Sequence, residues 1–273
     1  MQCIVTALGI ESENFISFYQ LSRVKEFKFP VYQNCDMVLV QTGIGKDNIE
    51  SRLKSISALL NNFERCQFIN IGIAGGNPDL VNIGDCLIIN KISSDNSVET
   101  YYPDILVDHK MKEASIITVR EPVTQGSKEY PELVDMEASE IFRVCKELVP
   151  IHRMAFIKIV SDYMVQDQNL SKKNFIMELI YSNLNEISKF LEKFNKLNFF
   201  EKSILDKRDI KWISNFVSKW KLTETQKFQL ENVLKFIRTG KSHDSFPEIP
   251  DEVPKNKFQR NKLFNQFCEK YST

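Results

Sequence analysis

Two apolar runs joined by glycine turns place the tightest constraint on how this chain can fold. The first run, residues 68–71, has the length of a strand and breaks into a turn at residues 72–76. Three of those five turn residues are glycine, which permits backbone angles that are closed to other residues. The second run covers residues 86–89. Such a turn lets a ligand approach the main chain closely, although a tight packing turn without a ligand gives the same pattern.

The same pattern of strand, turn and helix recurs nearer the N-terminus. Residues 3–8 are predicted to form a strand that enters a loop at residues 9–13. Residues 36–41 predict a second buried strand, followed by a glycine turn at residues 42–46 and an amphipathic helix at residues 48–63. This alternation is typical of an α/β sheet with helices on its faces. The 42–46 turn is too short for a P-loop, so it fits a plain connection as well as a ligand-binding turn.

Three carboxylates stand where strands end or helices begin. Glu11 follows the first strand, Glu137 lies near the start of a helix predicted over residues 134–148, and Asp162 follows a strand at residues 154–160. Such positions can converge on one edge of a sheet, and paired acids that share general acid and base roles are what glycosidic cleavage requires. Helix capping is the alternative role for Glu137 and Asp162.

Composition excludes several other classes of protein. The 36 basic and 36 acidic residues balance, so overall charge indicates neither a nucleic-acid partner nor a membrane surface. The three histidines have no metal-ligand spacing, and the six cysteines are scattered without a Cys-x-x-Cys pair. No signal peptide is recognisable and no apolar run reaches membrane-spanning length. We therefore predict a cytoplasmic protein with reduced thiols, no metal and no cofactor.

The C-terminal part of the chain has a different character. Residues 199–273 contain one glycine and no convincing strand, and they predict helices at residues 209–220, 223–240 and 256–271. The second of these opens on a Thr-Glu-Thr-Gln capping box. This part carries 15 Lys and Arg against ten Asp and Glu, a net charge of +5. It could contact a nucleic acid or an acidic partner, but a solvated helical extension is the simpler interpretation.

Six short motifs, taken together, resemble those of a known superfamily. They occur at residues 7–11, 42–46, 72–76, 83–85, 134–138 and 160–162. In this order and at these spacings they resemble the nucleoside phosphorylase / nucleosidase superfamily, most closely the methylthioadenosine/S-adenosylhomocysteine nucleosidases. The resemblance covers residues 1 to about 195. Each motif is short, but the ordered set is specific.

The resemblance implies a fold, an assembly and an activity. The expected fold of residues 1–198 is a three-layer α/β/α arrangement around a central mixed sheet, and residues 199–273 would be a helical extension of unknown role. The protein would be a homodimer that hydrolyses the N-glycosidic bond of a purine nucleoside without a cofactor. Asp162 suits a 6-amino purine, because its carboxylate can accept a hydrogen bond from the exocyclic amine. The implied substrate is a 5′-modified adenosine, and the products are adenine and a ribose derivative.

The resemblance also assigns roles to individual residues. Glu11 matches the acid that activates the attacking water. Asp162 matches the residue that protonates the leaving base, with Ser161 orienting it, and Met136 and Glu137 match the ribose-binding pair. The other positions expected to line the pocket are Gly43, Gly45, Ile73, Gly75, Gly76 and Val123.

Two departures from the superfamily's pattern leave alternatives open. Asn70 and Ile73 stand where the phosphorolytic branches have an arginine and a Ser or Thr, so water is the expected nucleophile. A phosphate-dependent phosphorylase remains the first alternative.

The segment between Val119 and Val134 is shorter than in the methylthioadenosine/S-adenosylhomocysteine nucleosidases. Pro122, Val123 and Thr124 would line the region where those enzymes place an aromatic residue on the base and a flap over the 5′ substituent, so the sequence does not identify the 5′ group. The second alternative is an inactive nucleoside-binding or regulatory protein that acts through its basic C-terminal helices.

Overall fold

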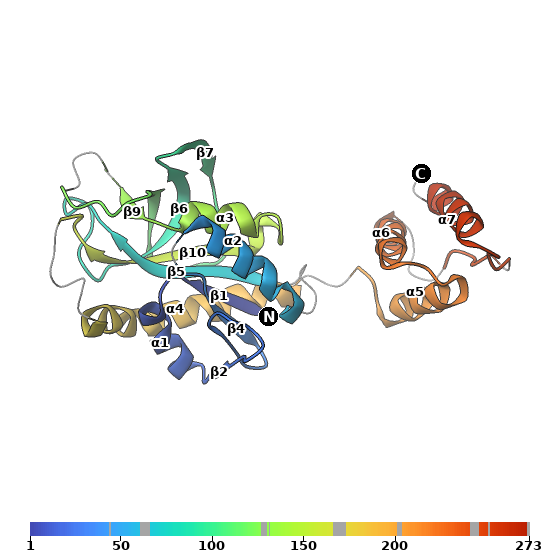
Figure 1. Ribbon diagram of the computed structural model, residues 1–273, viewed down its shortest axis with the longest axis horizontal. Coiled ribbons are helices and arrows are strands. Elements are labelled where there is room, and N and C mark those ends of the chain that lie inside the picture. The colour runs from blue at the N-terminus through green and yellow to red at the C-terminus, as the bar shows by residue number, and fades with distance from the viewer. Residues whose placement is uncertain are drawn as a thin grey trace. The chain divides into compact units, whose positions relative to one another are not determined.

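The computed structural model describes residues 1–43, 45–60, 66–126, 130, 132–165, 173–200, 204–240, 246–250 and 252–271. It separates into two compact units, Met1–Phe200 and Glu201–Thr273 (Figure 1). Ile44 of the second glycine turn and the end of the helix predicted at residues 48–63 lie outside the described residues.

The N-terminal unit is built on a mixed sheet, as the sequence predicts. Its described strands are β1 (Gln2–Thr6), β2 (Ser22–Arg23), β3 (Val31–Gln33), β4 (Met37–Gln41), β5 (Gln67–Gly75), β6 (Cys86–Ser94), β7 (Ser97–Tyr101), β8 (Lys112–Thr118), β9 (Leu133–Asp135) and β10 (Met154–Asp162). They are ordered β10-β6-β8-β9-β5-β1-β4-β3-β2, with β7 on β6. β5 pairs in parallel with β1, and β1 with β4, so all three end at one edge of the sheet.

Half of this sheet closes on itself. β10 pairs in parallel with β5 and antiparallel with β6, and β9 pairs with both β8 and β5. Together with the parallel β6–β8 pair, these contacts join β5, β10, β6, β8 and β9 into a five-stranded barrel. The predicted three-layer arrangement therefore describes only part of the unit, because apolar patterns predict strands but not the long-range pairing that closes them.

Helices cover the two faces of the sheet (Figure 1). They are α1 (Gly9–Phe18), α2 (Lys46–Ser55), which continues into the 3₁₀ turn Ile56–Leu59, α3 (Ala138–Cys145) and α4 (Lys173–Phe200). Side chains alternate between the faces along each strand. Val5 and Phe156 belong to the core that includes residues of α2 and α3, whereas Ile4 and Ile157 belong to the core that includes residues of α1 and α4.

Two local predictions were wrong, and one strand was not predicted. Residues 9–13 are not a loop, because α1 begins at Gly9. The helix predicted over residues 134–148 is a strand, β9, followed by the shorter helix α3. Strand β7 was not predicted, because Ser97–Tyr101 is exposed and polar and lacks the apolar signal of a buried strand.

The C-terminal unit contains the three predicted helices, α5 (Lys207–Trp220), α6 (Glu224–Gly240) and α7 (Lys257–Tyr271). The capping box is confirmed: Gln226 N–H donates to Thr223 Oγ1, and Thr223 N–H donates to the Gln226 side chain. The apolar core of this unit comprises Leu205, Ile213, Phe216, Trp220, Leu222, Leu230, Leu234, Phe264 and Phe267. Across the described part of the whole chain, no helix combines the length and the apolar character needed to cross a membrane.

Candidate active site

A cavity of about 320 Å³ lies in the N-terminal unit, beside the ends of β1, β5, β9 and β10. Among the residues singled out from the sequence, those lining it are Glu11, Ile73, Gly75, Val123, Met136, Glu137, Ser161 and Asp162. Gly43, Gly45 and Gly76 are not among its lining residues. The cavity therefore brings together the three carboxylates from segments that are far apart in the sequence.

Glu11 is fixed in the first turn of α1 by main-chain donors. Its Oε2 accepts hydrogen bonds from the N–H groups of Ala7, at 2.9 Å, and Leu8, at 2.8 Å. Its Oε1 accepts from the N–H of Ile73 at 3.1 Å, and the side chain is only 3% exposed. A Cβ at position 72 would lie 2.8 Å from Oε1, so the glycine there makes room for the carboxylate. Burial raises the pKa of Glu11, although these N–H groups and the charge of Lys158 partly oppose the rise.

A buried ion pair lies beneath the carboxylates. Lys158 of β10 places its Nζ 2.8 Å from Oδ2 of Asp135, at the end of β9, and both side chains are at most 2% exposed. Asp135 also accepts hydrogen bonds from the Thr118 hydroxyl at 2.7 Å and the Ala138 N–H at 2.9 Å. Burial alone would lower the pKa of Lys158, but the surrounding carboxylates, Asp135 first, outweigh burial and raise it. The amine therefore stays protonated at neutral pH.

Lys158 was not among the residues predicted from the sequence to belong to the site. The sequence pattern that could have identified it is a lysine inside an otherwise apolar strand, residues 154–160. A lysine in such a strand indicates a nearby acidic partner, because lysine is almost never fully buried unless it is paired.

Glu137 precedes α3 as its N-cap residue and faces the same cavity. Burial, and then the negative charges of Asp135 and Glu11, raise its pKa from 4.5 to about 7, while Lys158 acts in the opposite direction. Glu137 consequently changes its charge near neutral pH, between a carboxylate that accepts hydrogen bonds and an acid that can also donate one.

Asp162 lies at the end of β10, where the register with β5 shifts between Val160 and Asp162. Its Oδ2 accepts a hydrogen bond from the Ser161 hydroxyl at 2.7 Å, and its Oδ1 accepts from the N–H of Met164 at 2.8 Å. Bulges of this kind re-aim side chains next to functional sites. Each carboxylate oxygen keeps a free lone pair, so Asp162 can still accept from a ligand.

Most of the remaining wall of the cavity is apolar, although Thr124 and Asp135 also line it. The apolar part includes Leu8, Val119, Pro122, Val123, Val134, Met136, Met164 and Val165. Within the described part of the lining, there is no aromatic side chain and no Lys or Arg. Asn70 does not line the cavity: its amide donates to the Val5 carbonyl at 3.1 Å, and its Oδ1 is buried without a hydrogen-bond partner. The described lining therefore offers no cation that would bind a phosphate.

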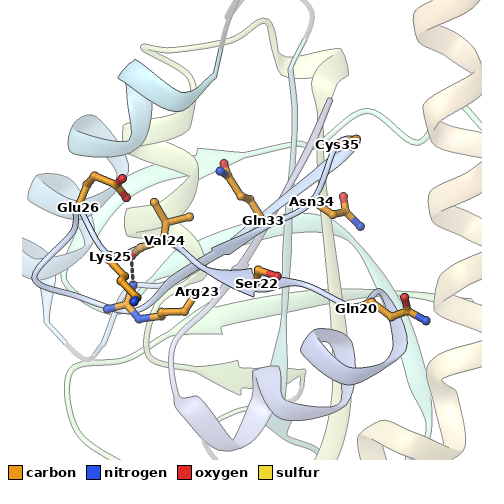
Figure 2. A pocket seen from close by; sticks show the side chains of 9 residues that line it. All are labelled: Gln20, Ser22, Arg23, Val24, Lys25, Glu26, Gln33, Asn34 and Cys35. Atoms are coloured by element: carbon orange, nitrogen blue, oxygen red, sulfur yellow. Dashed lines mark hydrogen bonds between the residues drawn. The ribbon is translucent and has the colours of Figure 1, made fainter.

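Two other findings bear on the choice of site. A larger cavity of about 610 Å³ lies beside β2 and β3 (Figure 2). Its described lining has a single carboxylate, that of Glu26, so this cavity does not bring several acids together as the smaller one does. Among the described residues, no group of three or more His, Cys, Asp or Glu side chains could hold a metal ion.

Solved structures with a similar fold are nucleosidases. The 5′-methylthioadenosine/S-adenosylhomocysteine nucleosidase of Neisseria meningitidis, in complex with methylthio-immucillin-A, matches with a TM-score of 0.58 at 19% identity and covers 70% of this chain and 98% of its own. The Streptococcus pneumoniae enzyme, with a transition-state inhibitor, matches with a TM-score of 0.59 at 19% identity over 71% and 99%. A Chlamydia trachomatis MTAN variant bound to MTA matches with a TM-score of 0.57 at 20% identity over 71% and 98%.

No protein-family model and no curated protein sequence matches the chain. At these low identities the structural likeness establishes the fold alone. The N-terminal part of this chain has a nucleoside phosphorylase/nucleosidase-like fold.

Proposed function

We propose that this protein hydrolyses the N-glycosidic bond of a purine nucleoside, releasing the base and a ribose derivative. The observation that carries the proposal is the meeting of Glu11, Glu137 and Asp162 around one cavity. Each acid has a distinct environment, which is what separate roles in one reaction require. The nucleosidase-like fold supports the same reaction class by analogy.

The three acids divide the chemistry of cleavage. As the bond to the base lengthens, the sugar gains positive charge, which negative carboxylates stabilise. Glu11, a stronger base than an exposed glutamate, removes a proton from the attacking water while the water oxygen bonds to the sugar carbon. Asp162 donates a proton to a ring nitrogen of the base, and the bond's electron pair leaves with the base. Glu137 accepts hydrogen bonds from the ribose hydroxyls.

Water rather than phosphate is the proposed nucleophile. A phosphate anion is bound most strongly by cationic donors. The Ile73 main-chain N–H already donates to Glu11. Of the two hydroxyl side chains in the described lining, Ser161 and Thr124, the first donates to Asp162. The described lining includes no Lys or Arg. The proposed base is adenine, because a free lone pair on Asp162 can accept from the 6-amino group.

The proposal includes an assembly and a location. By resemblance, the protein is a homodimer, and its scattered cysteines, which have neither a disulfide nor a zinc-site pattern, favour a cytoplasmic location. The proposed catalytic unit is the N-terminal unit, Met1–Phe200, which supplies every described residue that lines the cavity.

Base release from a panel of nucleosides tests the function. Purified full-length protein is incubated with methylthioadenosine, 5′-deoxyadenosine, S-adenosylhomocysteine, adenosine and inosine, with and without phosphate, and free base is quantified by chromatography. We expect adenine from at least one 5′-modified adenosine at equal rates with and without phosphate. Release only with phosphate would identify a phosphorylase, and no release in either condition would favour the inactive binding or regulatory protein.

The charge of Glu137 should give the reaction a specific pH dependence. The carboxylate binds ribose hydroxyls best when ionised, and its pKa is about 7. The KM for the nucleoside should therefore rise as pH falls from 8 to 6.

The same carboxyl group should also make the stability of the protein depend on pH. Glu137 of the unfolded chain loses its proton near pH 4.5, whereas Glu137 of the folded protein keeps it up to about pH 7. The free energy of unfolding should therefore fall as pH rises through this window.

The Glu137→Gln variant isolates these effects. It should bind nucleoside more weakly, with a KM that no longer depends on pH between 6 and 8, and it should flatten the pH dependence of the thermal midpoint. Glu178→Gln on the exposed side of α4 is the matched control and should leave both profiles unchanged. An unaltered KM profile in Glu137→Gln would contradict the assignment of Glu137 to the ribose.

A further inference from the structure

Met164 has an unusual backbone conformation for its place in the fold. Three non-glycine residues in the described part of the chain have positive φ: Gln20, Met164 and Lys221. Lys221 directly follows α5 and Gln20 follows the C-cap residue of α1, and left-handed residues commonly end a helix at such positions. Met164, at φ 57°, follows a strand instead. A strained non-glycine residue beside a candidate catalytic group requires another explanation.

The main chain of Met164 joins two walls of the cavity. Its N–H donates to Oδ1 of Asp162 at 2.8 Å, and its carbonyl accepts from the N–H of Gly126 at 2.7 Å. The next residue, Val165, pairs with Gln125 in an antiparallel bridge. The left-handed turn thus ties the proposed acid to the segment that carries Pro122, Val123 and Thr124 into the cavity.

The side chain of Met164 is directed by the same turn into the cavity wall. It is 1% exposed, and it forms an apolar cluster with Val119 and Val134 against which Val123 and Met136 pack. A Cβ on Gly75 would lie 2.7 Å from Met164 Cγ, so the glycine at that position allows the thioether side chain to lie close to the end of β5. The close fit on both sides indicates a fixed position for this side chain.

We propose that Met164 is a specificity-determining residue whose thioether packs against the purine base next to Asp162. This inference rests on the proposed function. A purine needs an apolar surface beside the group that protonates it, and the described lining provides aliphatic and thioether groups but no aromatic ring. A polarizable sulfur makes favourable contacts with aromatic rings, especially at the ring edge. The Met164 N–H donates to the Asp162 carboxylate. The same turn therefore fixes both the side chain that contacts the base and the acid that protonates the base.

The Met164→Gly variant separates the side chain from the backbone. Glycine adopts positive φ without strain, so the bonds to Asp162 and Gly126 are preserved while the thioether is lost. We expect the affinity for free adenine, measured by isothermal titration calorimetry on the full chain, to fall about tenfold. The KM for the adenine nucleoside should rise by a similar factor and kcat should change less. Met164→Leu, which restores an apolar side chain of similar size, should recover most of the affinity.

Gln20→Gly is the matched control, because it makes the same backbone change at an exposed residue outside the cavity. It should leave adenine binding unchanged, and thermal melting should give a folded protein for every variant. Adenine binding within twofold of wild type in Met164→Gly would overturn the role of Met164 alone. Wild-type protein that binds no adenine and cleaves no adenine nucleoside would overturn the proposed function and this inference together.

Discussion

Replacement of Asp162 by Asn is expected to slow adenine release by about 10²–10⁴-fold, the usual contribution of a positioned general acid. The amide has nearly the same shape but has no acidic proton to give to the leaving base. The fold should survive, because the amide oxygen can still accept from the Met164 N–H. The Ser161 hydroxyl, which already lies 3.3 Å from the Ala74 carbonyl, can donate there and accept from the new amide. The rate is measured by chromatography of free base under saturating nucleoside.

A matched substitution shows whether the loss is specific to the site. Asp85 also accepts a main-chain N–H, that of Asn82 at 3.0 Å, but it does not line the cavity. Asp85→Asn should therefore keep the wild-type rate. If Asp162→Asn retains more than a tenth of the wild-type rate at an unchanged thermal midpoint, the base is protonated by another group.

Replacement of Lys158 by Met is expected to cost about 3–5 kcal/mol of stability, the range measured when one partner of a buried ion pair is removed. The apolar stem is retained, but Asp135 is left as a buried carboxylate without its cation. Removal of this positive charge should also raise the pKa of Glu137 further, because Lys158 lowers that pKa in the wild-type protein. Urea unfolding followed by circular dichroism measures the stability change.

Asp135, the partner of Lys158 in the ion pair, provides the control for this stability loss. Asp135→Asn in the Lys158→Met background removes the stranded charge, and its amide oxygen can still accept from Thr118 or Ala138. The double variant should therefore be more stable than Lys158→Met alone. Both tryptophans, Trp212 and Trp220, belong to the C-terminal unit, so tryptophan fluorescence reports on that unit and not directly on the unit that carries the substitution. A single variant as stable as wild type would show that Asp135 is neutral without Lys158.

The elements and acids that sequence predicted were those with strong local signals. Apolar runs gave most of the buried strands, and a capping box located the start of α6. The three carboxylates were selected because each follows a strand or starts a helix, and all three line the cavity. Gly75 could also be placed there, since it lies in a glycine turn at the end of a strand.

The features that sequence did not predict depend on contacts between distant segments. The pairing of β10 with β5 is specified by packing across the barrel, not by any pattern within either strand. The sequence does not indicate that Lys158 pairs with Asp135, because the two residues lie on different strands. Met164 resembles an ordinary apolar residue, and only its backbone angle and its bond to Asp162 set it apart. The loop predicted at residues 9–13 is helical because Glu11 accepts the N–H groups that precede the helix.

The closed barrel determines when the site can form during synthesis. Its closing strand, β10, is the last strand of the unit to leave the ribosome, yet it pairs with β5 and β6, which are made much earlier. Until then β5 and β6 have unpaired edges of the kind that promote aggregation. The nascent chain already contains Glu11 and Glu137, but it has neither Asp162 nor Lys158, the cation that pairs with Asp135. The cavity should consequently assemble late, in one cooperative step, with slow folding typical of non-local strand pairing.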